Sequence, residues 1–545
     1  MKRLPKLLAL LMSACVFLSS LTSCVSYLRL SSLLQNNETQ EEVEIPSVLE
    51  YCLTEADYQL FSTLLECFLT LALDGTDLDA IGTAEERMEA QYYHISTQSK
   101  IAYILYCCDT SDKGLSDQYL LATEMSTNAY GEYAEACRTL YQSDSVFRDE
   151  YFADWTKAEI SEMLHYSDEV TAISQENEQL LVEYRALSEE EFDGSAPGFF
   201  LDIVKNNTRT AELMGFDNYY DYAAERIYGR DFDRADIALM RTYVKEYIAP
   251  YLDDVYTAFE NQYQSLNSFR QAKIYRFLYR AYDNAGEYVQ SYLEALPEKM
   301  RQSMAAVLTP AGAIYATSSN AYEGAFTSYL PSLNMAYCYF GPNYQDTRTI
   351  VHEMGHYYAS CFEDGFYAPI DVAEIHSQAN EWLMLSTLAE SMEQKVYETL
   401  RLYLIYEAYS TVVSCMIIDE FENRVYCDPL NQYDTAVELD ALMEEICQDY
   451  GGIDFINQNV ADIQWYWRVV TVESPVYYIS YATSGIVALE FYLDATDNFN
   501  EAVEKYKLLI EGSGSAVGFA EAILEVGLSG AFSEETYKRL KNTFL

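Results

Sequence analysis

The chain has 545 residues and a formal net charge of −52, and half of its residues are apolar. The apolar content excludes global disorder, and the length allows two or three domains with sizeable cores. The acidic excess argues against nucleic acid as a partner, because phosphate binding needs a basic surface. Only 11 prolines occur, and apolar residues recur at helical spacing over long stretches, which predicts a mainly α-helical fold.

The beginning of the chain has the form of a targeting segment. Three basic residues precede an apolar stretch that ends at Leu18 and is too short to span a bilayer. The sequence Leu21-Thr22-Ser23-Cys24 follows. It resembles a bacterial lipobox, in which cleavage leaves a lipid-modified cysteine as the new N-terminus. The alternative is an ordinary secretory signal with a chance cysteine.

We therefore predict a lipoprotein signal peptide over 1–23, followed over 24–45 by a lipidated Cys24 and a polar, flexible tether. The lipid would anchor the protein to the extracytoplasmic face of a bacterial cell membrane or envelope. Ten cysteines follow Cys24. They have no C-x-x-C or zinc-finger spacing, so we assign no disulfide.

The rest of the chain divides into two predicted parts. The first contains helix after helix and no residues at catalytic spacing. The run Asp193–Gly198 is rich in turn-forming residues and predicts a turn, where we place the domain boundary. This gives an N-terminal helical domain over 46–195 and a second domain over 196–545, which contains the motifs described next.

Two short strands, Gly324–Thr327 and Asn334–Phe340, are predicted from their β-forming residues and the turn between them. A strand can offer its edge to an extended peptide through main-chain hydrogen bonds, so Ala325 is a candidate substrate contact. A small sheet with a purely structural role is the alternative. Asp346 then has the position and chemistry of an N-cap for the helix that follows.

That helix contains the motif around which the chain is organised, within the run Thr349–Tyr358. His352 and His356 are four residues apart and therefore lie on one helix face, where both can bind one Zn²⁺. Glu353, one step round the helix, can take a proton from the attacking water. The flanking residues carry no charge, which predicts a buried helix. Gly355 costs about 1 kcal/mol relative to alanine, which indicates that another element packs closely there.

A catalytic zinc site needs a third protein ligand. The first two downstream candidates border Gly365 in a predicted turn, where they follow the zinc helix too closely to return to its metal. Glu374 opens a second helix and shares one face with Ser377 and Glu381, so we predict Glu374 as the ligand. Glu381 would accept an imidazole N–H and fix the histidine tautomer. The acidic residues considered as the third ligand are Glu363, Asp364, Asp371, Glu374 and Glu381.

The sequence His352-Glu353-Met354-Gly355-His356, followed by Glu374-x-x-Ser377-x-x-x-Glu381, resembles the oligoendopeptidase F and thimet oligopeptidase family of zinc peptidases. Three further stretches agree: Gly215–Tyr219, Tyr481–Gly485 and the tail from Gly512 to Leu528. The resemblance covers about 206–545. It implies a mainly α, two-lobed zincin-like molecule with a small sheet beside the zinc helix. It also implies one Zn²⁺ per chain and a deep central channel that admits short peptides and excludes folded proteins.

The resemblance also implies tyrosines that stabilise the tetrahedral intermediate. Tyr481 matches the family tyrosine nearest the scissile carbonyl, and Tyr477 or Tyr478 would be a second substrate contact. Oxyanion donors of this kind are typically worth ~2.7–4 kcal/mol. The chain departs from the pattern in two ways. Relatives often carry a histidine upstream of this tyrosine, but no histidine follows His376 here, and the spacing before the third ligand is shorter, as in a trimmed loop.

We therefore predict a membrane-anchored zinc metalloendopeptidase that hydrolyses internal bonds of short peptides with a zinc-activated water. Glu353 would be the general base and Tyr481 the oxyanion donor. The expected partners are short peptides and, through the lipid, a membrane; we expect no nucleic acid and a monomer. Two alternatives stay open. One is a dipeptidyl carboxypeptidase or carboxypeptidase, and the other is a non-catalytic peptide-binding lipoprotein, which the missing histidine supports.

Overall fold

The structure is a computed structural model that describes residues 46–187, 189–279, 285–362, 368–427, 433–451, 469–514 and 517–544. Most of these residues are helical, and one small sheet lies among the helices, which confirms the predicted mainly α class. The predicted signal peptide, Cys24 and the tether lie outside the described residues, as do Glu363 and Asp364. These predictions therefore stay predictions.

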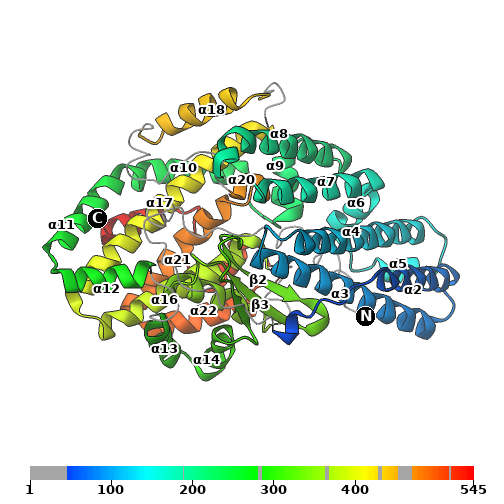
Figure 1. Ribbon diagram of the computed structural model, residues 1–545, viewed down its shortest axis with the longest axis horizontal. Coiled ribbons are helices and arrows are strands. Elements are labelled where there is room, and N and C mark those ends of the chain that lie inside the picture. Colours follow the sequence, from blue (N-terminus) through cyan, green and yellow to red (C-terminus); the bar gives the residue numbers. More distant parts are fainter. Residues whose placement is uncertain are drawn as a thin grey trace.

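The N-terminal helices pack side by side around a core of their own (Figure 1). The helix that begins at Lys157 ends at His165, and a new helix begins at Asp168, because Ser167 has an extended backbone and caps it by accepting from the Val170 N–H. The bounds are α2 (Glu55–Asp74), α3 (Leu78–Cys108), α4 (Lys113–Tyr141), α5 (Arg148–Tyr151), α6 (Lys157–His165) and α7 (Asp168–Arg185), after a 3-10 turn at Ser47–Leu49.

The predicted turn at Asp193–Gly198 is wrong. Helix α8 (Glu189–Leu213) runs through it and contains Pro197. Ala196 and Phe200 are fully buried on one face of α8 and belong to the large core, so tertiary packing overrides the local turn propensity. A domain boundary near 195 stays a prediction, without a break in the helix to mark it.

The middle of the chain is a run of shorter helices. A 3-10 turn, Ala249–Tyr251, separates two of them and contains Pro250, because proline is poorly tolerated inside a helix. The bounds are α9 (Tyr219–Tyr222), a π turn (Ala223–Ile227), α10 (Arg234–Tyr247), α11 (Leu252–Ser265), α12 (Ser268–Tyr279), α13 (Ala285–Ala295), α14 (Glu298–Met304) and a 3-10 turn (Ala305–Leu308).

The sheet has three strands in the order β1-β3-β2. Strands β2 (Ala325–Leu330) and β3 (Met335–Phe340) form an antiparallel pair and confirm the two predicted strands. Strand β1 (Ala313–Tyr315) pairs in parallel with β3. The sequence prediction missed β1, because three residues are too few to show an alternating pattern.

The sheet lies between two hydrophobic cores, and each of its faces packs against one of them. Figure 1 shows β2 and β3 beside the N-terminal helices. Side chains alternate between the faces of a strand. Phe326 and Tyr339 accordingly point to the core of the N-terminal helices, whereas Ala325 and Phe340 point to the larger core. The larger core contains the predicted zinc helix, so the sheet fixes the position of that helix relative to the N-terminal helices.

The remaining helices contribute to the larger core. The most extensive association in the larger core is between α16 and α21 (Figure 1). Helix α15 also packs on α16. The bounds are α15 (Thr347–Ala359), α16 (Ile370–Ser391), α17 (Gln394–Cys427), α18 (Ala436–Gln448), α20 (Val469–Glu473), α21 (Ile479–Asp497), α22 (Phe499–Gly512), α23 (Phe519–Glu525) and α24 (Glu534–Phe544).

Within the described residues, α17 alone is long and apolar enough to cross a membrane by length and composition. Its apolar window is 67% buried inside the protein, which is typical of a core helix. None of the cysteines from Cys52 to Cys447 forms a disulfide in the described part of the chain. Cys107 is buried in α3, as the apolar run around it predicts.

Candidate metal centre

The zinc helix α15 begins as predicted. Asp346 caps it and accepts from the backbone N–H groups of Arg348 (2.9 Å) and Thr349 (3.2 Å). His352 and His356 lie on one face, with ring centroids 5.1 Å apart. His352 is 4% exposed and His356 is half-buried, so the helix presents one buried and one partly accessible imidazole.

Gly355 explains how closely α16 approaches this helix. A Cβ atom at position 355 would lie 2.2 Å from the backbone oxygen of His376 and 2.8 Å from the Cα of Ser377. The backbones of α15 and α16 therefore touch at a point where only glycine fits. This confirms the close packing predicted from a mid-helix glycine, and it brings the second turn of α16, which carries Glu374, toward the two histidines.

The structure brings the three predicted ligands together. The donor atoms of His352, His356 and Glu374 all lie within 4.8 Å of one another. Glu374 Oε2 is 3.6 Å from His352 Nε2 and 3.8 Å from His356 Nε2. All three residues are on helices, which hold a site more rigidly than loops do.

Glu381 lies where the sequence predicts, behind the first histidine. Its Oε1 accepts from His352 Nδ1 at 2.8 Å, which leaves Nε2 of His352 to face Glu374. Arg348 donates from Nε to Glu381 Oε2 at 3.1 Å and from a second nitrogen to Glu407 at 2.6 Å. This chain of hydrogen bonds fixes the tautomer and the ring orientation of His352.

Tyr477 has a role that the sequence did not predict. The resemblance implied a substrate contact, but its hydroxyl donates to Glu374 Oε1 and its side chain is fully buried. Ser377 donates to the other oxygen, Oε2, at 3.0 Å. Both oxygens of Glu374 are thus held before any metal arrives.

Thr327 on β2 holds the predicted general base and was missed by the sequence analysis. Its hydroxyl donates to Glu353 Oε2 at 2.6 Å, and Glu353 is 2% exposed. The available signal was the position of Thr327, two residues after Ala325 and on the same face of a strand predicted to lie near the zinc helix. That signal does not show which helix residue the hydroxyl meets.

The electrostatics favour a bound cation. Burial raises the pKa of Glu353 to about 7 and lowers that of His356 well below its usual value. Burial also lowers the pKa of His352, but the hydrogen bond to Glu381 and the nearby carboxylates outweigh burial and raise it to about 9. Burial raises the pKa of Glu374. Three acidic side chains therefore crowd two imidazoles in a buried space, and a divalent cation would offset their repulsion.

The residues present fit Zn²⁺. Two imidazole nitrogens and one carboxylate are a donor set of catalytic zinc sites, which keep a fourth position open. Burial keeps the imidazole of His356 neutral, the form that binds a metal. One imidazole is also oriented by a carboxylate, as metal-binding histidines usually are.

Two residues near the motif belong to other networks. Asp371, weighed as a ligand, is fully buried and accepts from Arg230 Nε at 2.9 Å and from Thr483 at 2.5 Å. We call the group His352, His356 and Glu374 the metal cluster. His376 points away from it, with Nε2 3.0 Å from the Ser513 hydroxyl. Asp371 therefore joins the start of α16 to α21, and His376 packs in the core.

The tyrosines next to the start of α21 pack against one another, and Tyr477 also contacts Glu374. The ring of Tyr481 lies 5.4 Å from that of Tyr477 and 5.7 Å from that of Tyr478. Tyr481 is 7% exposed, whereas Tyr478 is 1% exposed. Burial raises the pKa of Tyr481 well above its usual value, and the charge of Glu374 raises it further, so its hydroxyl stays protonated and can donate.

Strand β2 has a free edge beside the metal cluster, since it pairs only with β3 among the described strands. The Gly341 N–H donates to the Gly324 carbonyl. Hydrogen-bonded positions alternate along an antiparallel pair, so alternate residues of 325–329 direct their main-chain groups outward. The outermost of these carbonyls, at Tyr329, accepts from Lys100 Nζ at 3.0 Å. The edge without a strand partner therefore extends over Ala325 and Thr327, next to Glu353, and these two residues are 1% and 4% exposed.

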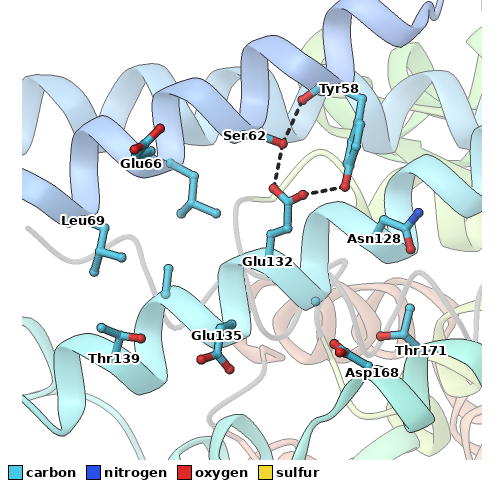
Figure 2. Close-up of a pocket in the computed structure, with 13 residues that line it drawn as sticks. Tyr58, Ser62, Glu66, Leu69, Asn128, Glu132, Glu135, Thr139, Asp168 and Thr171 are labelled. Atoms are coloured by element: carbon cyan, nitrogen blue, oxygen red, sulfur yellow. Dashed lines mark hydrogen bonds between the residues drawn. The ribbon is translucent and has the colours of Figure 1, made fainter.

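A second group of carboxylates lies in a groove of about 430 Å³ on the N-terminal helices (Figure 2). Glu132 is half-buried there and accepts from the hydroxyls of Tyr58 (2.5 Å) and Ser62 (2.7 Å). No histidine or cysteine is among the lining residues, so the groove lacks the donors that zinc prefers. The four carboxylates that line it are Glu66, Glu132, Glu135 and Asp168.

Comparisons with known proteins agree with this architecture. The sequence matches no family model and no curated protein. Among solved structures, a protein described as an oligoendopeptidase F from Bacillus anthracis str. Ames superimposes with a TM-score of 0.71 at 18% identity, over 91% of this chain and 96% of that one. PZ peptidase A, solved with an inhibitor, gives 0.71 at 17% identity, over 91% and 98%.

The oligoendopeptidase F from Enterococcus faecium is also similar, with a TM-score of 0.53 at 13% identity, over 90% of this chain and 97% of that one. The match extends across the N-terminal helices, the sheet and the helices that carry the metal cluster. The chain therefore has the fold of the oligoendopeptidase F structures, as its sequence motifs predicted.

Proposed function

We propose that the protein is a zinc metallopeptidase of the oligoendopeptidase type, which hydrolyses internal bonds of short peptides. The observation that carries the proposal is the group His352, His356 and Glu374, whose donor atoms lie within 4.8 Å of one another beside the buried Glu353. The fold supports it, because the similar structures are described as peptidases. Residues of one chain supply all three members of the group.

Zn²⁺ held by these three residues would polarise the scissile carbonyl and lower the pKa of water toward ~7. Glu353, fixed by the Thr327 hydroxyl, accepts a proton from the attacking water and then delivers it to the leaving amine. Tyr481 donates a hydrogen bond to the oxygen of the tetrahedral intermediate, as the family resemblance implies.

The substrate lies extended along the free edge of β2. The main-chain groups of Ala325 and Thr327 would pair with the peptide backbone, which binds peptides without reading their side chains. Thr327 thus joins substrate binding to catalysis, because its main chain lies on the edge while its hydroxyl holds Glu353. A channel that admits only short peptides follows from the resemblance.

The test is an assay on a short quenched peptide that is blocked at both ends, together with metal analysis of the purified protein. We expect one Zn²⁺ per chain, internal cleavage, loss of activity with a chelator and recovery with Zn²⁺. Cleavage only of peptides with a free C-terminus would instead support the carboxypeptidase alternative. Zinc binding without hydrolysis of either peptide would support the peptide-binding lipoprotein.

We also propose that the mature protein is anchored to the outer face of a membrane through Cys24. The support is the basic and apolar leader followed by Leu21-Thr22-Ser23-Cys24. Cys24→Ala should leave the precursor unprocessed or release the protein from the membrane fraction. A variant that is still cut at the same place and still sediments with membranes would contradict the anchor, and the peptidase assay is independent of this outcome.

A further inference from the structure

The turn before the tyrosines of α21 contains an unusual backbone. Val476 has a φ of +67°, in the left-handed region that β-branched residues rarely adopt. In the described part of the chain, the other non-glycine residue with positive φ is Asn334, a residue type that tolerates this region. A valine held there needs surrounding structure to impose the conformation, and such residues cluster at functional sites.

Two side chains impose it. Glu422 on α17 is 1% exposed, and its Oε1 accepts from the backbone N–H of Val476 at 2.8 Å. The Tyr228 hydroxyl donates to the preceding carbonyl, that of Pro475, at 2.7 Å. The other oxygen of Glu422 has no hydrogen-bond partner among the described residues. Among the described residues, the Glu422 carboxyl group therefore hydrogen-bonds only to the backbone N–H of Val476.

The residue that follows is Tyr477, whose hydroxyl donates to Glu374 Oε1. The backbone at Val476 determines the direction in which the Tyr477 side chain leaves the chain. An ordinary negative φ at Val476 would turn that side chain away, and Glu374 would lose the donor to its Oε1. Hydrogen bonds and one peptide link therefore connect Glu422 through Val476 and Tyr477 to Glu374, the third predicted metal ligand.

We infer that Glu422 is a positioning residue for the metal centre: it holds Val476 in the left-handed conformation, so that Tyr477 fixes Glu374 before zinc binds. The inference rests on the proposed zinc site. Residues behind the ligands commonly change metal affinity by ~10–100-fold when they are removed, so the effect should appear in zinc binding as well as in turnover.

The experiment measures zinc affinity by competition with a chelator, on folded protein checked by circular dichroism. Glu422→Leu should weaken zinc binding about tenfold. Glu422→Gln keeps an oxygen that accepts from the Val476 N–H, so its affinity should stay close to that of the unmodified protein. If Glu422→Leu does not fold, the zinc affinities of Glu422→Gln and Tyr477→Phe are compared instead. That comparison isolates the contribution of the contact between Tyr477 and Glu374.

Rescue distinguishes positioning from simple packing. Glycine enters the left-handed region without steric cost, so Val476→Gly introduced into the Glu422→Leu protein should restore most of the zinc affinity. Tyr477→Phe should weaken binding by a similar factor, and Glu422→Leu should add little to it, because both changes remove the same contact. Unchanged affinity in Glu422→Leu, no rescue by glycine, or fully independent losses would overturn the inference.

These outcomes separate this inference from the proposed function. An unmodified protein that binds no zinc overturns both. An unmodified protein that binds zinc and cleaves the blocked peptide, with a Glu422→Leu variant of equal zinc affinity, overturns the positioning role alone.

Discussion

Two groups of carboxylates in this protein have similar composition and different surroundings. Glu353, Glu374 and Glu381 are buried or nearly so, each with a hydrogen-bond donor, and they face two histidines. In the groove of the N-terminal helices, Glu66 and Glu135 are exposed to solvent and face no histidine (Figure 2). In a chain with 86 acidic residues, a group of carboxylates by itself is therefore no evidence for a metal site. Burial beside imidazoles distinguishes a metal site from a solvated surface.

The physical difference lies in the dielectric surroundings. Water screens exposed carboxylates, so their mutual repulsion is small. Buried carboxylates have no such screening, and burial raises the pKa values of Glu353 and Glu374. A bound cation would relieve the repulsion among Glu353, Glu374 and Glu381, whereas the groove needs none. The four predictions that follow each pair a change at or near the histidine-containing site with a control variant.

The largest effect is expected for Glu374→Ala. Removing one of three ligands should release zinc on dialysis against a mild chelator, and peptide hydrolysis should disappear with it. Glu381→Ala, which changes a partner of His352, should cost only ~10–100-fold in affinity or activity. The matched control from the groove is Glu132→Ala, which should keep zinc and activity. A metal-free Glu381→Ala beside a metal-replete Glu374→Ala would reverse the assignment of the ligand.

Glu353→Gln should retain zinc and lose activity. The amide keeps the shape and the contact with Thr327 but cannot act as a base, and loss of a general base costs ~10²–10⁴ in rate. The measurement is kcat on the blocked peptide together with zinc content. Glu132→Gln makes the same chemical change in the groove and should leave both values unaltered. Substantial activity in Glu353→Gln would move the base to another residue.

Gly355→Ala tests the contact between α15 and α16. The new Cβ would meet the backbone oxygen of His376 at 2.2 Å, and backbone cannot give way as a side chain can, so we expect a loss of ~1–3 kcal/mol in the free energy of unfolding. Gly82→Ala in α3 meets no atom within 4 Å and should stabilise the protein by up to ~1 kcal/mol. Urea unfolding of zinc-free protein compares them, and equal shifts would refute the close approach.

Thr327→Val should have the smallest effect, a fall of about tenfold in kcat, which corresponds to ~1.4 kcal/mol of transition-state stabilisation. The hydroxyl orients Glu353 and touches no metal ligand, so KM and zinc content should not change. Thr327→Ser keeps the hydroxyl and should recover most of the rate. If serine and valine behave alike, the hydroxyl does not position the base.

Much of the candidate metal centre could be predicted from the sequence, because its signals are local. The i, i+4 spacing of His352 and His356 defines one helix face without knowledge of the rest of the fold. Asp346 as a cap and the close packing at Gly355 also follow from local rules, and the structure bears both out. The helical spacing of Glu374 and Glu381 separated the carboxylate that faces both histidines from the one behind His352.

The misses came from contacts between distant segments. The turn expected at Asp193–Gly198 is part of α8, because burial of Ala196 and Phe200 outweighs local propensity. The link from Thr327 to Glu353 joins a strand to a helix, and the link from Tyr477 to Glu374 spans 103 residues. No periodicity in the sequence encodes such pairs.

The sequence by itself determined the candidate donors, the candidate base and their order along two helices, since these depend on spacing within one helix. The tertiary structure alone decided which groups hold those residues in place. Thr327, Tyr477 and Glu422 act through hydrogen bonds between elements whose distance is set by packing. The left-handed backbone of Val476 shows the same division, because a valine adopts it only where surrounding side chains outweigh its own local preference.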